Sequence, residues 1–60
     1  MQKGTKQTSV EIQEDLFYEF KMTSVRYKMS LKKLVDRSIY LYLTNPDFRN
    51  QVNSQTTTEL

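Results

Sequence analysis

The predicted fold depends on one alternating stretch near the start of the chain, Thr8-Ser9-Val10-Glu11-Ile12. Its apolar β-branched side chains recur at every second residue, which places them on one face of an extended backbone. Such a face is typical of a half-buried strand, so the pattern predicts a strand over residues 6–12. No later segment offers a partner strand, and an unpaired strand edge favours pairing with another chain. We therefore expect the strand to pair with the same strand of a second copy.

Two helices are predicted after this strand. The first should run over residues 14–27, because two acids suit the positive end of a helix and an apolar stripe follows at helical spacing. The second should begin after Ser30, a favourable N-cap, with Met29 packing back against it. Residues 38–43 are rich in β-branched and aromatic side chains and could form a strand, but the helical stripe continues through them and favours a helix. The stripes are Leu16, Phe17, Phe20, Ser24 and Tyr27 in the first helix, and Leu31, Leu34, Val35, Ser38, Ile39 and Tyr42 in the second.

The end of the chain contains one more helix signal. Asn45, Pro46 and Asp47 combine an N-cap, a proline at the first helical position and an acid in the first turn. A short helix to Val52 is expected there. Residues 6–52 then form one domain, preceded by a flexible arm over residues 1–5 and followed by a disordered tail over residues 53–60.

Size and composition limit the class of protein. The chain has 60 residues, which allow one small domain. It has no cysteine and no histidine, which excludes disulfides and makes a zinc site unusual. Oligomerisation is the remaining way to stabilise so small a chain. We expect no metal and no cofactor and, because no apolar run is long enough for a membrane span, a soluble cytoplasmic protein.

The charge is unevenly distributed along the chain. Residues 21–37 carry six basic side chains and one acidic side chain, whereas the segments before and after them are net acidic. A dimer would present this basic cluster twice, which suits a polyanion such as DNA. An ordinary solvated basic surface is the alternative interpretation of the same cluster.

The order of strand, helix, short turn and helix over residues 6–44 resembles the ribbon-helix-helix family of DNA-binding proteins. The resemblance rests on the alternating strand, the acidic helix start Glu14-Asp15-Leu16, and Met29-Ser30 before the second stripe. It implies a mainly α fold with one strand: an intertwined homodimer whose two strands form an intermolecular, two-stranded antiparallel β-ribbon. In that family the ribbon enters the major groove, where base edges distinguish all four base pairs.

The resemblance also implies roles for individual residues. The outward side chains of the ribbon would contact bases, and these are Gln7, Ser9 and Glu11, while Thr8, Val10 and Ile12 would face the dimer core. Phosphate would bind at the start of the second helix, at Ser30, Leu31 and the flanking Lys28, Lys32 and Lys33. Lys3 and Lys6 near the N-terminus would add further phosphate contacts. Two residues depart from the family pattern. Lys28 stands where the turn usually carries glycine in a left-handed conformation, and the carboxylate of Glu11 would be repelled by phosphate.

These expectations favour a sequence-specific transcriptional regulator, a repressor that binds double-stranded DNA as a homodimer and forms higher-order assemblies on it. An enzyme is not expected, because the chain has no histidine, no cysteine and no glycine-rich phosphate loop, and is too small for a cleft-sized core. Other classes remain open: a DNA-binding antitoxin, an accessory protein of plasmid partition or conjugation that recruits a protein through its C-terminal tail, or a helical dimer with no nucleic-acid role.

Overall fold

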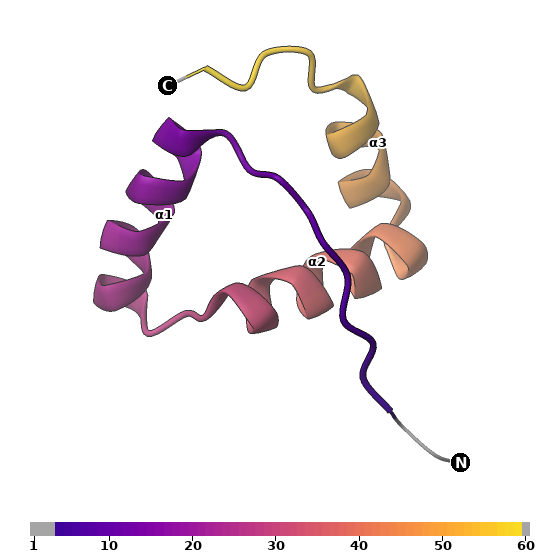
Figure 1. Ribbon diagram of the computed structural model, residues 1–60. Coiled ribbons are helices and arrows are strands. Elements are labelled where there is room, and N and C mark those ends of the chain that lie inside the picture. Colours follow the sequence, from indigo (N-terminus) through magenta and orange to yellow (C-terminus); the bar gives the residue numbers. More distant parts are fainter. Residues whose placement is uncertain (1–3, 60) are drawn as a thin grey trace.

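The computed structural model describes residues 4–59, which form three helices (Figure 1). They are α1 (Glu14–Tyr27), α2 (Leu31–Thr44) and α3 (Pro46–Ser54). An extended segment, residues 4–13, precedes α1, and residues 55–59 follow α3 without regular structure. The side-chain amide of Gln13 donates to the Thr58 hydroxyl at 2.7 Å, so the segment after α3 returns to the start of α1.

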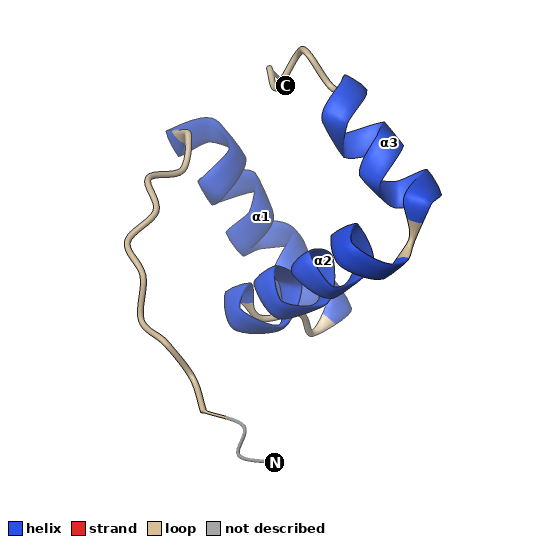
Figure 2. Ribbon diagram, turned by 90° about the vertical axis from the view of Figure 1, so that its right-hand side faces the viewer, coloured by secondary structure: helices blue, strands red, loops and turns tan. Residues whose placement is uncertain are grey.

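The predicted strand, and with it the ribbon-helix-helix fold class, is wrong. Residues 4–59 contain no strand, and Figure 2 shows the segment before α1 as a long loop. A strand exists only when its backbone is paired with a neighbour, and no backbone hydrogen bond within the described range ties residues 4–12 to another segment. Val10, expected to face a core, is 76% exposed. The alternating pattern therefore corresponds to an extended, solvated chain in an otherwise all-helical structure.

Helix α1 has the bounds that the sequence predicts. Glu14 and Asp15 lie in its first turn, and the helix ends where Lys28 adopts the left-handed conformation, with φ 55° and ψ 40°. The amides of Lys28 and Met29 both donate to the Ser24 carbonyl, the second at 3.0 Å, which satisfies a carbonyl at the helix end. Lys28 thus adopts the left-handed conformation for which the family pattern carries glycine, and the turn does not take a different shape at this residue.

Helices α2 and α3 begin at the predicted caps. The Ser30 hydroxyl accepts from the Lys33 amide at 3.1 Å, and the Asn45 side chain accepts from the Phe48 amide, also at 3.1 Å. Residues 38–43 are helical, as the continuous stripe predicts. Helix α3 ends at Ser54, two residues after the expected end. It packs against the end of α2, whereas α1 makes no close backbone contact with either helix.

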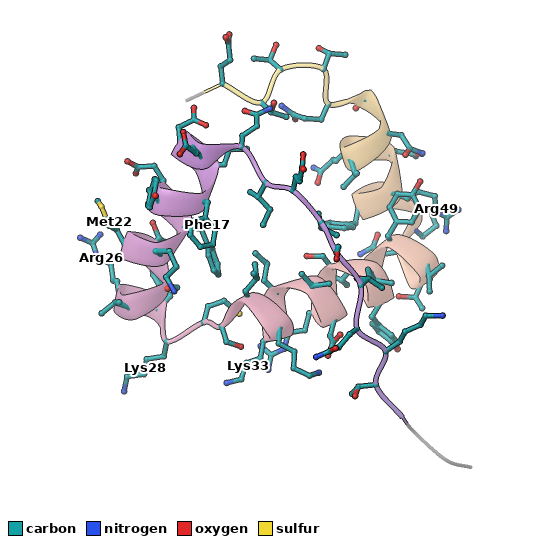
Figure 3. The ribbon with its side chains drawn as sticks, viewed as in Figure 1. Phe17, Met22, Arg26, Lys28, Lys33 and Arg49 are labelled. Carbon is teal, nitrogen blue, oxygen red and sulfur yellow. The ribbon has the colours of Figure 1, made fainter. Side chains whose placement is uncertain are left out.

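The three helices are arranged around a space that no buried side chain of residues 4–59 fills, so this part of the chain has no core. Figure 3 shows Phe17 directed from α1 into this space. No side chain among residues 4–59 is buried, and most of the α2 stripe, such as Leu34 and Ile39, is exposed. We call the two stripes on α1 and α2 the inner faces. A chain of this size with no buried side chain has little hydrophobic burial to offset the entropy of folding.

A candidate nucleic-acid interface at the corner between α1 and α2

The turn from α1 into α2 forms a basic corner made by Lys28, Ser30 and Lys33. All three residues are exposed. Figure 3 shows Lys28 and Lys33 directed away from the space that the helices surround. The left-handed backbone at Lys28 turns the chain sharply, and the Ser30 cap starts α2 at once. This local geometry brings two lysines to the positive end of a helix.

The first turn of α2 has backbone N–H groups that no side chain caps. The Ser30 hydroxyl accepts from the amide of Lys33, which leaves the amides of Leu31 and Lys32 without a side-chain cap. Amides at a helix start, together with the helix dipole, favour an anionic ligand. The basic corner therefore combines oriented donors with two full positive charges.

The neighbouring lysines differ in whether an acidic side chain neutralises their charge. Lys32 forms an ion pair with Asp36, one turn further along α2. Neither Lys28 nor Lys33 forms an ion pair with any residue between 4 and 59. Their charges are thus fully available to a ligand, whereas that of Lys32 is shared.

The extended segment lies beside the first turns of α2. A shallow hollow on this side of the molecule is lined by Gly4, Thr5, Lys6, Gln7 and Thr8 together with Lys32, Val35 and Asp36. The structure thus brings two predicted site residues, Lys6 and Gln7, close to a third, Lys32. Ser9 and Glu11 lie further along the segment and are exposed. Lys3 lies outside the described residues.

One residue that was not among the predicted site residues extends the basic corner. Arg37 follows Lys33 by four residues, so the two side chains lie on the same face of α2. Arg37 is exposed and forms no ion pair within the part of the chain that the structure describes. The spacing of Lys33 and Arg37 in the printed sequence could have identified it.

Other kinds of site find no support in the described chain. Residues 4–59 contain no group of three or more His, Cys, Asp or Glu side chains placed to hold a metal ion. Within the same range, no helix is both long enough and apolar enough to cross a membrane.

Comparison with protein-family models, with curated proteins and with solved structures finds no match to this chain. What the protein does must therefore be inferred from its own side chains.

Proposed function

We propose that this protein is a cytoplasmic, homodimeric DNA-binding protein that regulates transcription as a repressor. The observation that carries the proposal is the basic corner, where two exposed lysines without ion pairs adjoin the capped start of α2. It is a binding protein in this proposal and not an enzyme.

The chemistry of the basic corner suits the phosphates of a DNA backbone. Lysines at the surface release counterions from DNA when they neutralise phosphates, and this supplies most of the sequence-independent affinity. Free amides at a helix start add directed hydrogen bonds to a phosphate oxygen. Contacts of this kind fix the position of a protein on the duplex.

The inner faces support the proposed homodimer. A single copy buries none of its described side chains, so the apolar stripes of α1 and α2 need a partner surface. A second copy supplies a matching surface, because the same stripes are present on it. Dimerisation would also double the number of basic corners, and two phosphate-binding sites per particle strengthen binding to a repeating polyanion.

Base recognition would fall to the polar side chains of the extended segment. Gln7 and Ser9 are exposed and lie on a backbone that is not committed to pairing with the rest of the described chain. Glutamine can bond adenine at two atoms, and serine both donates and accepts. Glu11 has a minor role in this proposal, because a carboxylate is repelled by phosphate.

Titration of labelled duplex DNA from the region upstream of the gene tests the proposal. The dissociation constant would be measured by fluorescence anisotropy at several salt concentrations. We expect salt-sensitive binding, and Lys33→Ala should weaken binding to all duplexes and flatten the salt dependence, by about two units of slope if both copies contribute. Lys33→Arg is the matched control, because it keeps the positive charge at the basic corner and should retain the salt slope.

Gln7→Ala tests base recognition separately. It should lower the ratio of affinities between the upstream duplex and a scrambled duplex while leaving the salt slope unchanged. Absence of salt-sensitive binding at micromolar protein would refute the proposed function.

A further inference from the structure

Helix α1 carries a second apolar stripe on the side opposite its inner face. Tyr18, Met22 and Val25 follow one another at spacings of four and three residues, so they share one face of the helix. They are 60%, 67% and 80% exposed, respectively. Figure 3 shows Met22 directed away from α2 and α3. We call these three residues the outer stripe. In a single copy Met22 and Val25 stay largely open to solvent, while the Tyr18 ring packs edge-on against that of its neighbour Phe17, with ring centroids 5.7 Å apart.

The charges along α1 are arranged so that two copies of the helix are complementary when they run in opposite directions. Its first half carries three acids, its second half carries Lys21 and Arg26, and Lys28 follows at the turn. Two copies of α1 packed side by side in opposite directions would place acidic halves against basic halves. The helix dipoles would be antiparallel as well, which is the favourable arrangement. Parallel packing would instead place like charges together.

One pair of charges locates the contact. Glu19 and Arg26 are seven residues apart and lie on the same edge of the outer stripe. With Met22 and Thr23, they line a shallow hollow on this side of α1. Neither residue forms an ion pair with another residue in the range 4–59. In an antiparallel pair of identical helices, residues on the same edge face one another, so Glu19 of one copy would meet Arg26 of the other.

We propose that the outer stripe binds the outer stripe of a second copy, with the two α1 helices antiparallel and a two-fold axis near Met22. The contact is isologous, because the same residues are used on both copies. It is separate from the inner faces and needs no DNA, so it can be tested independently of the proposed function. A dimer formed through the inner faces would retain two outer stripes and could join further dimers.

Charge reversal tests the predicted pairing. Sedimentation equilibrium of the full chain without DNA would measure the association constant of the step that joins copies through the outer stripe. Arg26→Glu and Glu19→Arg should each weaken this step about tenfold or more, because each creates a like-charge pair twice in the symmetric contact. The double variant Glu19→Arg/Arg26→Glu should restore association to within about threefold of the wild-type constant.

Cysteine cross-linking provides a second readout, because the chain has no native cysteine. Met22→Cys places a thiol next to the two-fold axis, and its disulfide-linked dimer should form at least tenfold faster under oxidation than that of the control Asn50→Cys. Asn50 is an exposed residue on α3, away from the outer stripe. Equal rates for the two cysteine variants, or a double charge variant that associates as weakly as the single variants, would overturn the proposal. Circular dichroism of each variant checks that helix content is retained.

Discussion

Arg49 ties α3 to the end of α2 through Tyr42. The Arg49 Nε atom donates to the Tyr42 carbonyl at 2.9 Å, and the guanidinium lies 6.0 Å from the centre of the Tyr42 ring. A second guanidinium nitrogen donates to the Leu43 carbonyl at 3.3 Å. The Tyr42 hydroxyl in turn donates to the Asn53 side chain at 2.8 Å. One arginine thus satisfies two carbonyls at the negative end of α2, where a cation is favoured.

Replacement of Arg49 should loosen the junction of α2 and α3. Arg49→Ala removes charge-assisted hydrogen bonds from a half-buried side chain, and we expect the free energy of unfolding to fall by about 1–2 kcal/mol. Arg49→Lys should recover only part of this, since lysine cannot reach two carbonyls in a planar fork. Thermal unfolding followed by circular dichroism at one fixed protein concentration measures both changes. Equal stability of wild type and Arg49→Ala would show that the junction does not depend on this contact.

Lys28 is held in a conformation that costs energy for any residue with a Cβ atom. Lys28→Gly should raise the free energy of unfolding by about 1 kcal/mol, because glycine adopts φ 55° without steric strain. Lys28→Ala is the control, because it removes the same charge but keeps the strain. Urea unfolding of the wild type and the two variants separates the effect of backbone strain from the effect of charge. A gain in Lys28→Ala equal to that in Lys28→Gly would attribute the effect to charge instead.

Ser30 should have separable effects on stability and on DNA binding. Ser30→Ala removes the cap of α2 and should lower the free energy of unfolding by about 1 kcal/mol. Ser30→Asp keeps a capping oxygen and should be as stable as wild type. The added carboxylate should nevertheless weaken DNA binding at low salt, because it stands where a phosphate is proposed to lie. Unfolding curves and anisotropy titrations of the same two variants check both outcomes.

Stability should depend on protein concentration. If two copies cover each other's inner faces, the thermal midpoint should rise steadily over roughly a hundredfold increase in concentration, by mass action. Leu34→Glu places a charge on the inner face of α2 and should abolish cooperative unfolding. Tyr40→Glu places the same charge at another exposed position of α2, and cooperative unfolding of the two variants is compared. A wild-type midpoint independent of concentration would contradict the homodimer.

The helices could be predicted from the sequence because their signals are local. The hydrogen bonds of α1 close within the helix, and the Ser30 and Asn45 caps act over three residues, so the printed order of residues is sufficient. The strand depended on a partner that the order of residues does not contain, and that prediction failed. Arg49 was missed because its role is set by where α3 turns back on α2. The outer stripe was missed although its spacing is visible, because the inner stripe of the same helix is longer and has larger side chains.

The turn at Lys28 has a mechanical consequence. Since α1 makes no close backbone contact with α2, the angle between these helices within a single copy depends on a few backbone torsions at Lys28 and Met29. The outer stripe lies on α1, and the basic corner lies at the turn between α1 and α2. A small rotation there would change the distance between the basic corners of copies joined through α1. If the protein binds DNA as proposed, such a rotation would let neighbouring copies match the helical repeat of a duplex.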